Sequence, residues 1–298
     1  MHGTPQLRRR PAAIFAEGKQ YRYHAEWRLL RNSAKFQRMT QFGDGLPQLR
    51  RRVRRDLAED GLPRAKVLAA IVGLLDATWI RIGSAQYARD NDSYGLTTLR
   101  NRHVRFPRSD RLLFRFRAKG GAQHKQLARI VRRCHQLPGQ RLFQYLDEGV
   151  HHPIDSGQVN QYLKDAMGAA FTAKDFRTWG ATLQAIQIMA CAPLPESMSE
   201  HALNACIGAA VKQVATQLRN TPAVCRNSYI NPIVFTGWRE GVLHEMIPAE
   251  ISTAPRKSER VALASLRRLT DVSRPARSGA RRRANQDAGS AAAARVAP

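Results

Sequence analysis

Between residues 64 and 79, apolar positions recur at steps of three and four residues. This spacing places them on one face of a helix. Gly61 and Pro63 stand just before the segment and favour a turn there. The pattern therefore predicts a helix over 64–79, buried along one side. The residues on that face are Val67, Leu68, Ile71, Leu74, Leu75 and Trp79.

The pattern changes to a period of two within residues 96–118. Leu112, Phe114 and Phe116 alternate with Leu113, Arg115 and Arg117, which is typical of a half-buried strand. The run Lys119-Gly120-Gly121 then predicts a tight turn. We therefore expect a small antiparallel sheet that presents Lys119 at a turn.

Most of the remaining chain has a helical pattern. A helical region over 21–57 should break at Gly43–Pro47, and one over 125–238 should have loops at 137–139, 152–153 and 191–193. Residues 1–18 look like an irregular basic leader. Beyond Ile251 the chain is rich in Arg, Ala and Ser, which predicts a disordered basic tail. The expected fold is α+β and mainly α, with a helical domain around one small antiparallel sheet.

The charge of the chain points to a partner. Lys and Arg number 49 against 23 Asp and Glu among 298 residues, a formal net charge of +26. Such an excess predicts a polyanion, either nucleic acid or an acidic membrane surface, although a solvated basic surface is the simpler alternative. The basic run 50–57 (RRRVRRDL) is equally compatible with a solvated and with a phosphate-facing helix.

The sequence disfavours a membrane-spanning, a metal-binding and a disulfide-bonded protein. No apolar run is long enough to span a membrane. His151 and His152 have no nearby partner at metal-ligand spacing, so no metal site is expected. The cysteines show no paired spacing and are expected to be free thiols in a reducing compartment. They are Cys134, Cys191, Cys206 and Cys225.

The candidate chemistry centres on Tyr229, in the run NTPAVCRNSYINP, and on Arg177, about fifty residues earlier in the run KDFRTWGAT. A phenol can act as a nucleophile towards a phosphodiester, and arginines can stabilise the added negative charge on phosphorus. Taken singly, an arginine is more often an ion-pair residue and a tyrosine more often packs. The combination is what suggests a site.

Three further residues extend the candidate set. Arg81 directly follows the apolar helix, so the scaffold could hold it rigidly. Lys119 could reach a DNA groove or donate a proton to a leaving alkoxide. Asn220 offers an uncharged NH2 donor for a phosphate oxygen. Each has an ordinary alternative as a helix-end arginine, a polar turn residue or a helix cap.

Six runs in this order carry a family resemblance: KQYRYH, WIRIG, YGLTTLRNRHV, FRFRAKGG, KDFRTWGAT and NTPAVCRNSYINP. At these runs the chain resembles the type IB DNA topoisomerases in their small bacterial and poxvirus-like form. The resemblance extends from about Lys19 to about Trp238. The last two runs are the most specific.

The resemblance implies that Tyr229 attacks DNA to form a 3′-phosphotyrosyl link, and that reversal reseals the strand without ATP, metal or another cofactor. It implies that Arg81 and Arg177 stabilise the transition state. Lys119 would be the general acid for the 5′ oxygen. Asn220, where the family has His or Asn, would donate to a non-bridging oxygen. The expected additional DNA contacts are Tyr87, Arg100, Arg102 and Lys174, of which Tyr87 and Lys174 follow from the resemblance.

The expected organisation also follows the family. We expect only the last residues of its amino-terminal, mainly β domain to be present, so that 19–60 holds a remnant and linking helices. Residues 61–250 would form the catalytic domain of the topoisomerase IB and tyrosine recombinase type, followed by the tail at 251–298. The expected partner is double-stranded DNA, bound by a monomer in a bacterial cytoplasm, without a membrane or an obligate protein partner.

Two alternatives remain open from the residues. A tyrosine recombinase or integrase uses the same chemistry, but recombinases usually have His at the position of Lys174 and Leu-Gly-His in place of Leu218-Arg219-Asn220. Both differences favour the topoisomerase. A non-catalytic DNA-binding relative would keep the charge and lose turnover.

Overall fold

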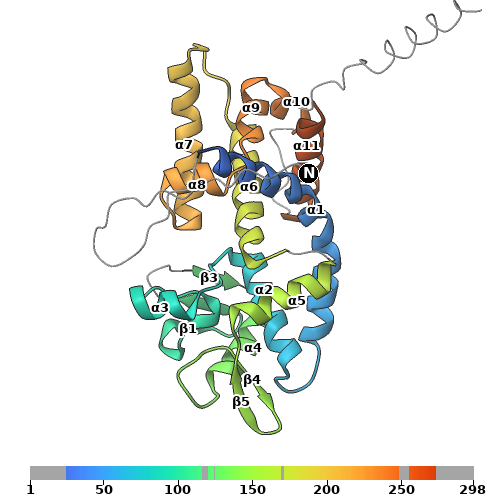
Figure 1. The fold of residues 1–298 in the computed structure, drawn as a ribbon, viewed down its shortest axis with the longest axis vertical. Coiled ribbons are helices and arrows are strands. Elements are labelled where there is room, and N and C mark those ends of the chain that lie inside the picture. The colour runs from blue at the N-terminus through green and yellow to red at the C-terminus, as the bar shows by residue number, and fades with distance from the viewer. Residues whose placement is uncertain (1–24, 116–119, 124, 169–170, 248–254, 273–298) are drawn as a thin grey trace, which may run out of the picture.

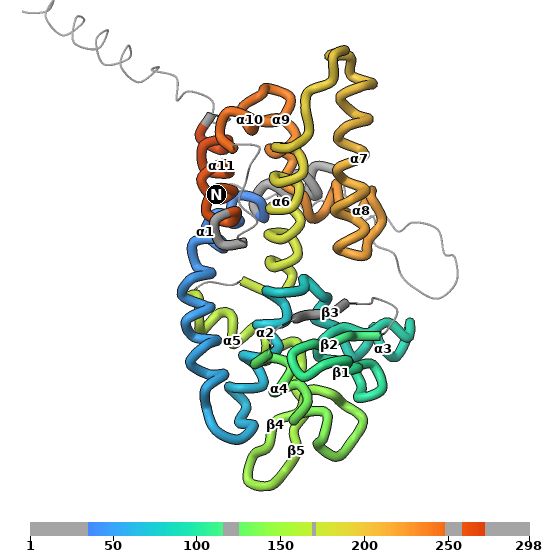
Figure 2. Tube along the Cα trace, turned by 180° about the vertical axis from the view of Figure 1, so that it is seen from behind, coloured from blue at the N-terminus to red at the C-terminus, as the bar shows by residue number. Residues whose placement is uncertain are grey.

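The computed structural model describes residues 25–115, 120–123, 125–168, 171–247 and 255–272. Figures 1 and 2 show two groups of elements. Helices α6 to α11 form one end, and the strands with α2 to α5 form the other. Helix α1 runs along one side of both. The architecture is α+β and mainly α, as the sequence predicts.

Helix α1, Ala25–Leu57, is continuous, so the predicted break at Gly43–Pro47 is wrong. Phe42, Leu46 and Leu49, in and beside that segment, are buried at helical spacing, and this burial outweighs the poor helix propensity of glycine and proline. Gly43 also permits a close approach, because a Cβ atom there would lie 2.8 Å from the Trp179 ring.

Helix α2, Arg64–Thr78, confirms the predicted helix, but its burial is not confined to one side, because every residue from 66 to 72 is buried. Its apolar face is buried, and the helix lies at the centre of the fold against α1, α4, α5 and α6. It ends at Trp79, whose φ of 53° is left-handed and turns the chain out of the helix. Because the buried residues of α1 and α2 belong to one core, residues 35–57 pack as part of the same body as the predicted catalytic domain.

The three-stranded antiparallel sheet has the order β1-β2-β3. Leu112 and Phe114 are buried and Leu113 is exposed, which confirms the alternation. Gly120 and Gly121 pair with β2 instead of forming the predicted turn. Lys119 and Phe116 lie outside the described residues. The strands are β1 Val104–Arg108, β2 Arg111–Phe114 and β3 Gly120–Gln123, preceded by short 3-10 turns at Leu96–Thr98 and Asn101–His103.

A second sheet was not predicted. Strands β4, Gln144–Asp147, and β5, Val150–Pro153, form an antiparallel hairpin within the region expected to be helical. The predicted loop at 152–153 therefore belongs to β5. The hairpin turn uses left-handed backbone at Glu148 and Gly149. The other helices are α3 Ala85–Asn91, α4 Lys125–His135, α5 Ser156–Met167, α6 Ala173–Cys191, α7 Glu200–Leu218, α8 Pro222–Ser228, α9 Ile233–Arg239 and α10 Val242–Met246.

Helix α11, Pro255–Val272, corrects the prediction that residues from 251 onward form a disordered tail. Ala262, Leu266 and Leu269 are buried at steps of four and three, and the helix packs on α1, α6 and α9. The many arginines of this segment concealed a short apolar face. Residues 273–298 lie outside the described residues.

Candidate active site

Arg81 lies in an irregular segment between α2 and α3 that is held by backbone hydrogen bonds. The Leu96 N–H donates to the Arg81 carbonyl at 2.9 Å, and the Thr97 N–H donates to the Ile82 carbonyl at 2.8 Å. The runs WIRIG and YGLTT are therefore neighbours in space. Gly95 allows this, because a Cβ there would overlap the backbone of Gly83. These contacts hold the backbone that carries Arg81 in place.

Arg177 is buried in α6, with 5% of the residue exposed. Its guanidinium donates to the carbonyl of Trp79, at the end of α2, and to the carbonyl of Leu218, at the end of α7, at 2.9 Å. Carbonyls at helix C-termini carry partial negative charge, which suits a cation. Burial lowers the pKa of Arg177, whereas attraction to Tyr229 opposes this. An arginine remains charged at neutral pH despite such a shift.

Tyr229 lies at the end of α8, half-buried beside Arg177. The guanidinium carbon of Arg177 is 5.1 Å from the centre of the Tyr229 ring. The hydroxyl of Thr182, on α6, donates to the Tyr229 carbonyl at 3.2 Å and accepts from the Asn231 N–H at 3.0 Å. The helix that carries Arg177 therefore also holds the backbone of Tyr229.

Asn220 follows α7, after a left-handed residue at Arg219 with φ of 51°. The Arg81 guanidinium donates to the Asn220 side-chain oxygen at 2.6 Å and approaches the Arg219 carbonyl at 3.4 Å. Four predicted residues thus meet from four places in the chain: Arg81, Arg177, Asn220 and Tyr229.

Two donors in this cluster are unsatisfied. Within the described part of the chain, Arg177 Nε and Asn220 Nδ2 are buried and have no hydrogen-bond partner. Buried donors without acceptors are rare because desolvation is costly, and they often mark a functional site. An anion with several oxygens, such as a phosphodiester, would supply the missing acceptors.

The predicted DNA contacts occupy different environments. Tyr87 on α3 is 59% exposed, and Lys174 in the first turn of α6 is also exposed. The Arg100 guanidinium lies 5.7 Å from the Tyr94 ring centre, so this residue also packs. Arg102 is exposed and its Nε is 3.3 Å from His103 Nε2. All four stay predictions as DNA contacts.

Sequence reasoning did not single out Thr182 or the two carbonyls that anchor Arg177. Thr182 is the last residue of the run KDFRTWGAT and lies on α6 with 0% exposure. A hydroxyl on a buried helical face is a detectable signal, because it needs a partner. The backbone carbonyls of Trp79 and Leu218 have no side-chain signature, so only the fold reveals them.

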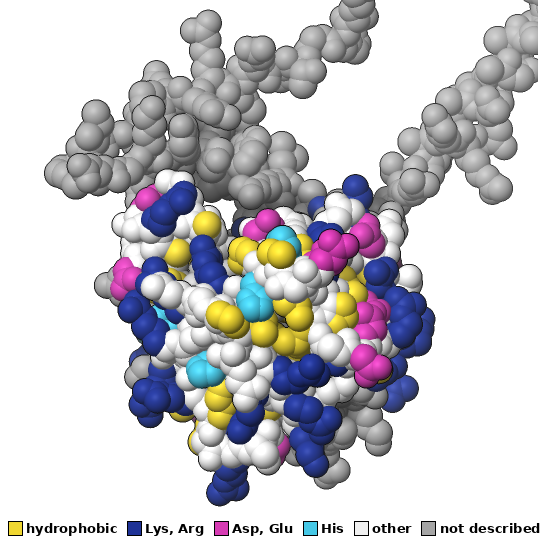
Figure 3. Space-filling view, turned by 90° about the horizontal axis from the view of Figure 1, so that it is seen from below, with side chains coloured by type: hydrophobic (Ala, Val, Ile, Leu, Met, Phe, Trp, Pro, Cys, Tyr) yellow, Lys and Arg dark blue, Asp and Glu magenta, His cyan; other side chains and the backbone are white. Residues whose placement is uncertain are grey.

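Two further findings concern the rest of the described residues. They include no helix long and apolar enough to cross a membrane, and no group of three or more His, Cys, Asp or Glu side chains arranged to hold a metal. Figure 3 shows Lys and Arg side chains distributed over the end of the molecule near β4 and β5, with His and apolar side chains among them.

The chain matches known proteins over most of its described length. The family model of the eukaryotic DNA topoisomerase I catalytic core matches residues 24–232. The chain is similar to DNA topoisomerase 1B of Acanthamoeba polyphaga mimivirus, with 30% identity over 224 residues that cover 71% of this chain and 66% of that protein. It thus spans just under two thirds of the length of this relative. The family match includes the cluster around Tyr229, and the chain belongs to the DNA topoisomerase I family of the eukaryotic, type IB kind.

Proposed function

We propose that this protein relaxes supercoiled double-stranded DNA by cutting and rejoining one strand, with Tyr229 as the nucleophile. The observation that carries the proposal is the pair of buried, unsatisfied donors, Arg177 Nε and Asn220 Nδ2, beside a half-buried phenol. Such donors can bind the oxygens of a phosphodiester, and the phenol beside them can act as the nucleophile towards its phosphorus.

In the proposed first step, the Tyr229 oxygen attacks the scissile phosphorus and its proton leaves to water. The bond between phosphorus and the 5′ oxygen breaks, and that oxygen takes up a proton to become a hydroxyl. The DNA is then joined to Tyr229 through its 3′ phosphate. In the second step the 5′ hydroxyl attacks this phosphotyrosine and restores both starting bonds. The energy of the phosphodiester is conserved, so ATP is not required.

The cationic groups would stabilise the five-coordinate phosphorus between these steps. Arg177 is held by two carbonyls and keeps Nε free for a phosphate oxygen. Arg81 holds the Asn220 oxygen, which leaves the Asn220 NH2 as a donor. Because hydrogen bonds within the fold already hold these groups in place, little reorganisation is needed in the transition state.

Lys119 is proposed as the acid that protonates the 5′ oxygen. It lies outside the described residues, but β2 ends at Phe114 and β3 begins at Gly120, so the hairpin that carries it is defined on both sides. Lys119→Ala should slow cleavage of an ordinary strand and leave cleavage of a strand with a better 5′ leaving group, such as a thiolate, much less affected. Equal slowing of both substrates would contradict this role.

The DNA would lie over Tyr229 and extend towards exposed Tyr87 and Lys174, with Arg100 and Arg102 as further contacts. The net charge of +26 would attract the duplex without sequence preference. We further propose that the protein acts as a monomer in a bacterial cytoplasm. Light scattering of the free protein and of its DNA complex tests the monomer, and a dimer in either state would contradict it.

Relaxation of a plasmid in the presence of EDTA tests the proposed reaction. The purified chain should convert supercoiled plasmid to relaxed closed circles, without ATP and without a partner site. Strand exchange that requires a specific site would indicate a recombinase instead. Binding without any change in linking number would indicate a non-catalytic relative and would overturn the proposal.

A further inference from the structure

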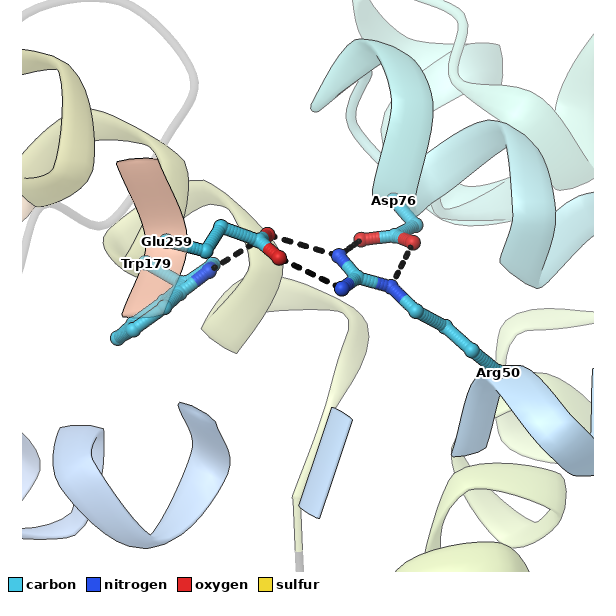
Figure 4. A network of polar contacts seen from close by, with 4 residues as sticks. All are labelled: Arg50, Asp76, Trp179 and Glu259. Atoms are coloured by element: carbon cyan, nitrogen blue, oxygen red, sulfur yellow. Dashed lines mark hydrogen bonds and ion pairs between the residues drawn. The ribbon is translucent and has the colours of Figure 1, made fainter. Parts of the chain in front are cut away.

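Arg50 connects three helices, α1, α2 and α11. It lies on α1, and its guanidinium makes two hydrogen bonds to Asp76 on α2, at 2.8 and 2.9 Å. It makes two more to Glu259 on α11, at 2.6 and 2.8 Å. Figure 4 shows this guanidinium between the two carboxylates. Paired contacts of this kind fix orientation as well as distance.

These contacts decide between two alternatives that the sequence leaves open for this residue. Arg50 begins the basic run 50–57, which could be solvated or face phosphate. Its guanidinium instead faces two carboxylates and is only partly exposed. Burial alone would lower the pKa of Arg50, but hydrogen bonds to Glu259 and Asp76 outweigh it and raise the pKa. The residue is therefore a charged link within the fold.

The contact between Arg50 and Asp76 connects Arg50 to Arg177 through α2. Asp76 is three residues before Trp79, within one helical turn, and the Trp79 carbonyl accepts a hydrogen bond from Arg177. The Trp79 ring also lies directly against α6, because a Cβ atom on Gly180 would overlap it. A shift of the last turn of α2 would therefore move an acceptor of Arg177.

The contact between Arg50 and Glu259 connects Arg50 to Arg177 through α6. Glu259 also accepts from the indole N–H of Trp179 at 3.5 Å, a long contact (Figure 4). Trp179 lies two residues after Arg177 on the same helix, is 3% exposed and packs edge-on against Phe42 of α1. Arg50 thus contacts α2 directly through Asp76 and is connected to α6 through Glu259 and Trp179.

We propose that Arg50 is a positioning residue for Arg177, acting through Asp76 and Glu259. It holds the end of α2 and the α6 helix in one relative placement, so that the buried guanidinium of Arg177 is aligned with Tyr229. The inference rests on the proposed role of Arg177 in the reaction. It also assigns α11, which follows the residues matched by the family model, a part in forming the site.

The test compares Arg50→Met with Arg52→Met, a matched change on the same helix. Arg52 is also partly exposed and also pairs with a carboxylate, Asp56 at 3.2 Å, but that carboxylate is on α1 itself and the Arg52 guanidinium lies over Tyr162 of α5. Single-turnover cleavage of a nicked duplex is measured at saturating DNA, at a temperature where circular dichroism shows each variant folded. Arg50→Met should cleave about tenfold or more slowly, and Arg52→Met within about twofold of wild type.

A double-mutant cycle separates positioning from general destabilisation. If Arg50 acts through Arg177, Arg50→Met should slow cleavage less than about twofold in an Arg177→Lys background. Dissociation constants for DNA should stay within about twofold throughout, because Arg50 faces carboxylates and not phosphate. If Arg50→Met does not fold, Glu259→Gln replaces it in the same cycle, with at least about threefold slowing expected.

The outcomes are distinguishable. Wild-type rates in a folded Arg50→Met protein, or the same slowing in both backgrounds, would overturn the inference. Weakened DNA binding with an unchanged cleavage rate would also overturn it. A wild-type chain that forms no covalent DNA adduct would instead overturn the proposed function on which the inference rests.

Discussion

Replacing Thr182 by valine should damage both stability and cleavage, because one hydroxyl satisfies two backbone groups. Thr182 donates to the Tyr229 carbonyl and accepts from the Asn231 N–H, and its side chain is fully buried. Valine has nearly the same shape and provides neither interaction. The change therefore removes the hydrogen bonds with little change in packing.

The expected loss in the free energy of unfolding follows from the burial of the two backbone groups. A buried backbone group left without a partner costs about 1–3 kcal/mol. Asn231 is buried, so its N–H should cost the full amount, whereas the carbonyl of half-buried Tyr229 can reach water in part. A total loss of about 2–3 kcal/mol in the free energy of unfolding is expected. A Tyr229 backbone released from α6 should also slow cleavage about 10- to 100-fold.

Urea unfolding and single-turnover cleavage measure the two effects. Thr178→Val is a matched control on the same helix, because the Thr178 hydroxyl contacts the Lys174 carbonyl, which is part of the helix, at 3.4 Å. Thr182→Ser keeps the hydroxyl and should cleave within about threefold of wild type. If Thr182→Val unfolds and cleaves as wild type does, Thr182 does not hold Tyr229 and the reasoning is refuted.

Three further results are expected. Arg177→Lys should cleave at least about 100-fold more slowly with DNA affinity nearly unchanged, because lysine cannot bond two carbonyls and still offer a donor to phosphate. Near-normal cleavage would contradict the proposed role of Arg177 in stabilising the transition state. DNA affinity should fall by about tenfold or more between 50 and 200 mM salt, since the positive charge acts through counterion release, and a flat salt response would argue against it. Burial raises the pKa of the Cys134 thiol to about 12, so the unfolded chain loses that proton first as pH rises. Ionisation of Cys134 therefore costs little stability below pH 9, whereas between pH 9 and 10.5 wild type should lose about 1.5 kcal/mol more of its free energy of unfolding than Cys134→Ala. Parallel pH curves for the two proteins would refute this.

The sequence predicted well those elements whose burial is periodic. The helix at Arg64–Thr78 and the alternation at Leu112 and Phe114 both appear as expected, because their apolar faces meet the same core. Errors arose where local signals opposed tertiary packing. Gly43 and Pro47 suggested a break, yet Gly43 packs against Trp179 of α6, Leu46 is buried in the core, and the segment stays helical.

Two other segments show how composition can mislead. The arginine-rich segment beyond residue 251 contains α11, because three buried apolar residues were enough to dock it. The hairpin at Gln144–Pro153 was missed because its strands are four residues long and carry mixed exposure. Short strands give too few positions for a period to be recognised.

The candidate site was predictable in its side chains and not in its supports. Arg81, Arg177, Asn220 and Tyr229 come together as the motifs suggest. The Trp79 and Leu218 carbonyls that hold Arg177 depend on where two helices end in space. The Arg50 link depends on Asp76 and Glu259, which lie 26 and 209 residues away from it in the chain, so spacing alone could not reveal it.

Capture of the covalent adduct identifies the nucleophile. A duplex with a short labelled end is incubated with the wild-type chain in EDTA, and the reaction is stopped with detergent and digested to peptides. DNA should be joined through its 3′ phosphate to the peptide that contains Tyr229, and Tyr229→Phe should give no adduct while binding DNA normally. An adduct at another residue, or plasmid relaxation that survives Tyr229→Phe, would contradict the role of Tyr229 as the nucleophile.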